Sequence, residues 1–150
     1  KSEYPHHINH DKNGVAEVKK LCKRLKMPTS WIKCGMVSAK EHMKAGIFNQ
    51  MTPNKQVEFF ERIDKTQLGL KGLEIIVESD RNCRGTRIDK VRFANLGKQV
   101  LTKVNGETVM KKYNIPSNER LKERIHQERI AYLKKLYDIE IKNNEDQVER

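Results

Sequence analysis

Cationic side chains are concentrated in the middle of the chain, and their chemistry suits the binding of phosphate. The candidate residues are Arg81, Arg84, Arg87, Lys90, Arg92 and Lys98, joined by Lys103. Arginine offers several donors in a fixed planar fork, which matches the oxygens of a phosphate group. If these side chains share one face of the protein, they would neutralise several phosphates and make binding dependent on salt. The segment therefore predicts contact with a nucleic acid, and the alternative is a solvated loop paired with Asp80 and Asp89.

Aromatic side chains in the same half of the sequence could supply a second type of contact. Single strands are bound by stacking bases on aromatic rings, a contact of about 1–3 kcal/mol per base. Tyr132 and Tyr137 lie on a predicted helix together with the cation Lys135. Tyr132 falls outside the apolar stripe of that helix, so it is the better candidate for stacking. Tyr137 belongs to the stripe, and core packing is the alternative for it.

Histidines at the start of the chain could bind a metal ion. His6, His7 and His10 lie close together in the sequence, and the segment faintly resembles part of the small His-Asn-His nucleases. No cysteine pair has the two-residue spacing of common zinc sites. We therefore expect a solvated histidine cluster with no metal or cofactor. A metal-dependent nuclease that uses this segment is an alternative function.

Catalytic residues are not predicted elsewhere. Cys83 lies between Arg81 and Arg84, which would lower its thiol pKa, but no histidine is near it in the sequence. Phosphate-binding P-loop and dinucleotide-binding motifs are absent from the sequence. The chain therefore resembles a binding protein more than an enzyme.

The composition agrees with a polyanionic ligand. The 150 residues include 31 lysines and arginines against 20 acidic residues, for a net charge of +11. Such an excess attracts nucleic acid, and an acidic protein partner is the alternative. Three cysteines, an odd count, favour a reducing compartment, and no apolar run is long enough to cross a membrane. We expect an intracellular protein, cytoplasmic or nuclear. The sequence lacks an initiator methionine, so a fragment of a longer chain is one interpretation that the sequence leaves open.

Hydrophobic periodicity predicts helices in residues 1–67. One is expected from Gly14 to Lys26 and a short one from Ser38 to Ala45. A third should start at Thr52-Pro53, because threonine caps helices well and proline is tolerated at the first helical position. Its buried stripe would consist of Val57, Phe59, Phe60 and Ile63.

Strands are predicted in the next part of the chain. From Leu68 to Val104 valine and isoleucine are frequent and glycines punctuate the runs. Asn105-Gly106 is typical of a hairpin turn. A long basic helix should follow from about residue 118 to Tyr137, and the alternation of 138–141 suggests a short final strand. The domain boundaries expected are 1–67 for the helical part, 68–142 for the β-rich part with the long helix, and 143–150 for a polar tail.

Two segments resemble a PAZ domain, the RNA-end-binding module of Argonaute, Piwi and Dicer proteins. The sequence from Gly69 to Val77, followed by a polar turn and residues 87–91, is similar to the opening of that domain, and residues 130–142 are similar to its closing segment. The resemblance covers about residues 68–142. It implies a small barrel that holds the 3′ end of a short RNA, and a role in RNA silencing. By the same resemblance, Tyr132 and Tyr137 would contact the terminal phosphate, and Arg84 or Arg87 would be the cations that contact the strand.

Together these observations predict an α+β protein. N-terminal helices would pack on a small β-barrel or sheet, with a long basic C-terminal helix. The expected function is nucleic-acid binding, through a single-stranded RNA end held by the arginine-rich loop and the tyrosines. The two alternatives are a basic protein–protein interaction module and the metal-dependent nuclease.

Overall fold

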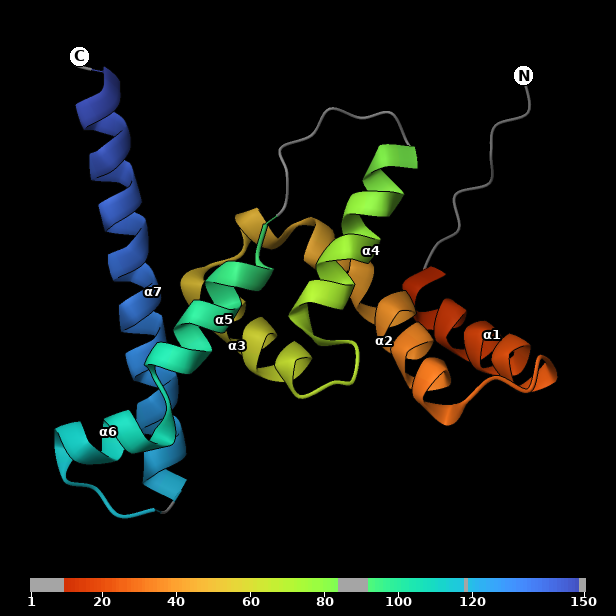
Figure 1. Cartoon of the computed structure of the whole chain (residues 1–150), viewed down its shortest axis with the longest axis horizontal. Helices are drawn as coiled ribbons and strands as arrows, with labels where there is room; N and C mark the ends of the chain where they lie inside the picture. Colours follow the sequence, from red (N-terminus) through yellow and green to blue (C-terminus); the bar gives the residue numbers. More distant parts are fainter. Residues whose placement is uncertain (1–9, 84–91, 118, 149–150) are drawn as a thin grey trace. The chain divides into compact units, whose positions relative to one another are not determined.

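The computed structural model describes residues 10–83, 92–117 and 119–148, and every regular element within these ranges is helical. Figure 1 labels them in chain order. They are α1 (His10–Arg24), α2 (Thr29–Gly46), the short 3-10 helix η1 (Phe48–Gln50), α3 (Pro53–Asp64), α4 (Gly69–Cys83), α5 (Ala94–Lys103), α6 (Gly106–Tyr113) and α7 (Glu119–Val148).

The predicted α+β fold is wrong, because the described part of the chain contains no strand and therefore no sheet or barrel. The clearest correction is α4, which was expected to be a strand. Its buried side chains Leu70, Leu73 and Val77 are three and four residues apart, which is the spacing of one helix face. Ile75, which a strand pattern would pair with Leu73 and Val77, is half exposed.

Asn105-Gly106 starts a helix and does not form the predicted hairpin turn. The Asn105 side chain accepts a hydrogen bond from the backbone N–H of Thr108 at 3.0 Å, and the Thr108 hydroxyl accepts from the Asn105 N–H at 3.1 Å. This reciprocal capping box satisfies two donors that the first turn of α6 would otherwise leave without partners. At its other end α6 closes on Asn114, whose φ of 50° is left-handed.

The predicted final strand at residues 138–141 is also helical and belongs to α7. The alternation there places Ile139 and Ile141 on the surface, with 46% and 56% of their area exposed.

The helices predicted in the N-terminal part are present, but the first two have other bounds, and α1 runs from His10 to Arg24 instead of from Gly14 to Lys26. Helix α3 begins at Pro53, and Val57, Phe59, Phe60 and Ile63 are all buried. Helix α2 is longer than expected and extends back to Thr29, so Ser38 lies inside it and does not cap it. The long basic C-terminal helix is confirmed as α7 and extends past Tyr137 to Val148.

The chain divides into two compact units. Unit 1 comprises residues 1–49 and 63–92, and unit 2 comprises residues 50–62 and 93–150. In unit 1, α2 packs against both α1 and α4. Gly35 permits the close approach of α1 and α2, because a Cβ atom there would lie 2.8 Å from Cγ1 of Val18.

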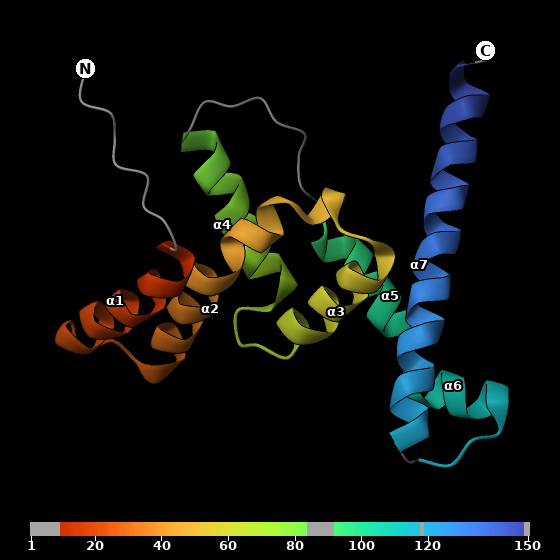
Figure 2. The same ribbon diagram turned by 180° about the vertical axis from the view of Figure 1, so that it is seen from behind.

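Unit 2 is built on α7. Helices α5 and α6 both contact it, and α6 lies beside the first half of α7 in Figure 1 and in the reverse view of Figure 2. Its core includes Phe59 and Phe93, whose rings meet edge to face with centroids 5.2 Å apart. A second cluster of Val104, Val109 and Leu121 joins α6 to α7. No helix within the described residues is long and apolar enough to span a membrane.

Candidate nucleic-acid interface

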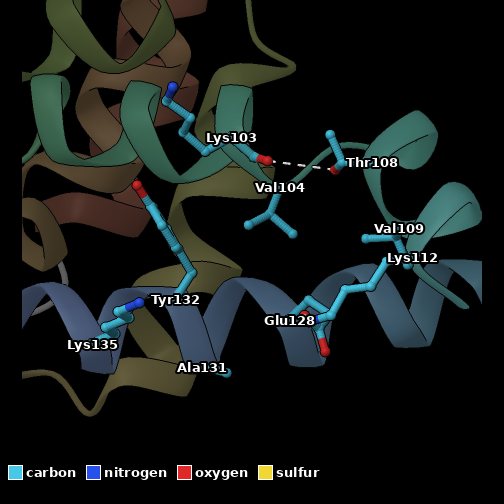
Figure 3. Close-up of a pocket in the computed structure, with 9 residues that line it drawn as sticks. All are labelled: Lys103, Val104, Thr108, Val109, Lys112, Glu128, Ala131, Tyr132 and Lys135. Carbon is cyan, nitrogen blue, oxygen red and sulfur yellow. Dashed lines mark hydrogen bonds and ion pairs between the residues drawn. The ribbon is translucent and has the colours of Figure 1, made fainter.

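A hollow of about 350 Å³ opens on unit 2 where the end of α5, helix α6 and the middle of α7 meet. Figure 3 shows the side chains that line it. They are Lys103, Val104, Thr108, Val109, Lys112, Glu128, Ala131, Tyr132 and Lys135.

The inner wall of the hollow is apolar. Val104 and Val109 are buried because they form the cluster that joins α6 to α7, and Tyr132 packs against that cluster. The Tyr132 side chain is partly buried, and its hydroxyl accepts a hydrogen bond from Gln99 Nε2 at 3.4 Å. The ring is therefore held between α7 and α5, with part of its surface open to the hollow.

One end of the hollow is cationic. Lys103 and Lys135 are exposed, and among the described residues neither has a carboxylate within ion-pair distance. In Figure 3 the Tyr132 hydroxyl lies between the two ammonium groups, on one side of the hollow. This end therefore offers two uncompensated positive charges beside an aromatic ring.

At the opposite end, Glu128 pairs with cations from both α6 and α7. Its Oε2 atom lies 2.7 Å from Lys112 Nζ, its Oε1 atom accepts a hydrogen bond from the Tyr113 hydroxyl, and Arg124 lies 3.6 Å away. The hydrogen bond from Lys112, followed by that from Tyr113, holds the pKa of Glu128 below its ordinary value. The same bond to Glu128 raises the pKa of Lys112. Arg124 also stacks on the Tyr113 ring at 3.9 Å. This cluster fastens α6 to α7, and Glu128 offsets one of its two positive charges.

A hydrogen-bond network fixes the backbone between α5 and α6. Arg129 donates from Nε to the Val104 carbonyl oxygen at 2.9 Å and from a terminal nitrogen to Glu61 at 2.9 Å. His126 bridges the other Glu61 oxygen, at 3.0 Å, and the Asn54 side-chain oxygen, at 3.1 Å. The network ties α3 and the α5–α6 connection to α7. It therefore positions Lys103, the residue before Val104, at the edge of the hollow.

Sequence reasoning missed this network, because Glu61 lies 68 positions before Arg129 in the sequence. The only local signal was the spacing of His126 and Arg129, which places both side chains on one helix face.

The structure places the sequence-predicted residues in different environments. Tyr132 and Lys135 line the hollow. Tyr137 does not line it: its hydroxyl donates to Gln56 at 2.9 Å, and burial raises its pKa. Lys98 is exposed on α5 in unit 2, and Arg92 is exposed in unit 1.

Other predicted residues cannot be placed. Arg84, Arg87, Lys90, His6 and His7 lie outside the described residues, as do the side chains of Arg81 and His10. Within the part of the chain that the structure describes, no group of three or more histidine, cysteine or acidic side chains could hold a metal ion.

Comparison with known proteins gives partial similarities. A multifunctional CCA protein from Xanthomonas euvesicatoria is 26% identical over 84 residues, which cover 55% of this chain and 20% of the relative. The protein of Acinetobacter baumannii strain ATCC 17978 is 32% identical over 62 residues, 41% of this chain and 15% of the relative. The protein of Xylella fastidiosa strain M23 is 26% identical over 82 residues, 53% of this chain and 20% of the relative.

Each of these relatives is a multifunctional CCA protein. The aligned part spans a fifth or less of their length. No family model matches the chain, and no solved structure matches it.

Proposed function

We propose that the chain binds RNA and that the hollow of unit 2 holds a single-stranded end. One observation carries the proposal: Lys103 and Lys135, which have no acidic partner among the described residues, flank the partly open ring of Tyr132. Two ammonium groups can bind consecutive phosphates, and the ring offers a face on which an unpaired base can stack.

The size of the hollow favours a nucleotide over a duplex. Its volume of about 350 Å³ is near the lower limit of the range for small-molecule sites, roughly 300–1,000 Å³. An unpaired terminal nucleotide can enter such a space, whereas a base-paired one presents only its edges. The apolar wall of Val104 and Val109 would cover the base from water.

The comparisons support a nucleic-acid-related function. The relatives are named for CCA, a trinucleotide sequence, and transfer RNA is our candidate for the RNA that carries this end. The resemblance to PAZ domains implied a similar ligand, the 3′ end of an RNA. The barrel that it implied is absent from the described residues, so the proposal rests on the helical hollow.

The test is the salt dependence of affinity for a short, labelled single-stranded RNA that ends in CCA. Lys103→Ala and Lys135→Ala should each weaken binding and reduce the slope of log affinity against log salt by about 0.7, the value for one phosphate contact on a single strand.

Lys134→Ala is the matched control, because Lys134 is exposed on the same helix and does not line the hollow. Its slope should stay at the wild-type value. Equal slopes for all three variants and the unchanged protein would overturn the proposed site.

A further inference from the structure

We propose that the hairpin of α1 and α2 in unit 1 is a second RNA-contact surface, on which Trp31 stacks against an unpaired base. The inference rests on the proposed function, because the ligand is the same single-stranded RNA. It concerns residues that the sequence analysis did not assign to a site.

The charge of the hairpin is the first observation. In residues 13–49, eight lysines and arginines stand against two glutamates, so this segment carries more than half of the net charge of +11. The eight cations are all exposed. They are Lys19, Lys20, Lys23, Arg24, Lys26, Lys33, Lys40 and Lys44.

The two glutamates compensate little of this charge. Glu17 pairs with Lys20 at 2.8 Å on the surface, and Glu41 is buried, with 3% of its area exposed. Within the described residues, the other seven cations make no ion pair. Such cations attract a polyanion and displace the counterions condensed on it, and the release of those ions makes the association dependent on salt.

The position of Trp31 is the second observation. It lies in the first turn of α2, where its N–H donates to the Pro28 carbonyl oxygen at 3.0 Å, and 63% of its area is exposed. A tryptophan buries roughly 150–250 Å² when it packs, so leaving it in water forgoes a large gain in stability. Stacking on a base would recover part of that gain.

The connection between the helices places cations at the end of the hairpin that carries Trp31. Helix α1 ends at Arg24 and α2 begins at Thr29, so the two are joined by four residues and lie side by side in Figures 1 and 2. Within this connection Lys26 has a left-handed φ of 53°. Lys23, Arg24 and Lys26 therefore lie at the same end of the hairpin as Trp31.

Single-stranded RNA fits this surface better than a membrane does. At this end of the hairpin the exposed apolar side chains besides Trp31 include Leu21 and Leu25, and Arg24 lies one helical turn after Leu21. A helix that lies on a membrane needs a continuous apolar face, whereas α1 uses Cys22 and Val18 for packing on α2. Alternating phosphates and planar bases match a surface that presents cations and an exposed ring at the same end of the hairpin.

The test uses the fluorescence of Trp31 in the full chain, since it is the only tryptophan. Titration with a short single-stranded RNA should quench its emission, and salt should reverse the quenching. Polyglutamate of matched charge, which has no bases, should leave the emission unchanged. Trp31→Ala, an exposed substitution, should weaken RNA binding about fivefold or more, as expected for the loss of one stacked base.

The outcomes separate this inference from the proposed function. If labelled RNA binds but Trp31 emission and the affinity of Trp31→Ala stay unchanged, the hairpin surface is overturned and the hollow of unit 2 stands. Quenching that persists in Tyr132→Leu supports an independent second contact. If polyglutamate quenched the Trp31 emission as strongly as RNA does, the surface would bind any polyanion, and the proposed stacking on a base would be wrong. A blue shift with phosphatidylserine vesicles, without a response to RNA, would identify a membrane surface and also overturn the inference.

Discussion

Arg129 on α7 donates a hydrogen bond to the carbonyl oxygen of Val104, 2.9 Å from its Nε atom, and so fixes the backbone where α5 gives way to α6. Lys103 precedes this carbonyl, and the α6 cap at Asn105 follows it. One guanidinium therefore holds one edge of the hollow in place without lining it.

Removal of Arg129 should loosen that edge. Its side chain is 17% exposed, and Arg129→Ala leaves the Val104 carbonyl and one Glu61 oxygen without this donor. We expect the free energy of unfolding, measured with urea, to fall by about 1–3 kcal/mol. RNA affinity should fall as well. Arg120→Ala is the control, because it removes the same charge from an exposed position on α7. If Arg120→Ala lost as much stability and RNA affinity as Arg129→Ala, Arg129 would have no positioning role.

The Glu128 cluster should make stability depend on pH in the acid range. The hydrogen bonds from Lys112 and Tyr113 lower the pKa of Glu128 below its ordinary value of 4.5 in the folded state. A carboxyl group with a depressed folded pKa stabilises the fold above its unfolded pKa, and that contribution is lost as the pH falls through the folded pKa.

Urea unfolding of the wild type and of Glu128→Gln at a series of pH values measures this contribution. The wild type should be the more stable protein above pH 4.5, and the difference should shrink as the pH falls, because a protonated glutamate resembles glutamine. A difference that does not change with pH would show that the ion pairs of Glu128 contribute nothing to stability.

The cap at Asn105 should stabilise α6. Asn105→Ala removes the acceptor for the Thr108 N–H, a loss of about 0.5–2 kcal/mol for a helix N-cap. Asn105→Ser retains a capping oxygen and should recover most of that stability. Urea unfolding measures the stability of the two variants. Equal losses of stability in Asn105→Ala and Asn105→Ser would contradict the role of the capping box.

The sequence predicts helices well where one apolar stripe is long. In α3 the spacing of Val57, Phe60 and Ile63 was sufficient, and all three are buried. In α4 the adjacent Ile75 and Ile76 favoured a strand by their branching, although Leu73 and Val77 already had helical spacing. Tertiary packing decides such a segment, because β-branched side chains only weakly oppose a helix that buries one face.

The sequence predicts only those residues of the candidate site that lie together on a single helix. Tyr132 and Lys135 could be chosen from α7 alone, since their positions outside its stripe follow from helical periodicity. Lys103 could be named as a cation, but its position beside Tyr132 depends on the α5–α6 connection. The link from Glu61 to Arg129 depends on a contact across 68 positions. The pair Asn105-Gly106 is compatible with both a hairpin turn and the start of a helix. Only Thr108, three residues after Asn105, distinguishes the two structures.

The central claim is that the Tyr132 ring stacks on a base of bound RNA. The most direct measurement compares affinities for a short single-stranded RNA between the wild type, Tyr132→Phe and Tyr132→Leu at one salt concentration. Leucine retains apolar contact with the Val104 cluster but has no aromatic face, and phenylalanine retains the face without the hydroxyl. We predict that Tyr132→Phe keeps the wild-type affinity and that Tyr132→Leu loses about fivefold or more. Wild-type affinity in a folded Tyr132→Leu protein would contradict the account.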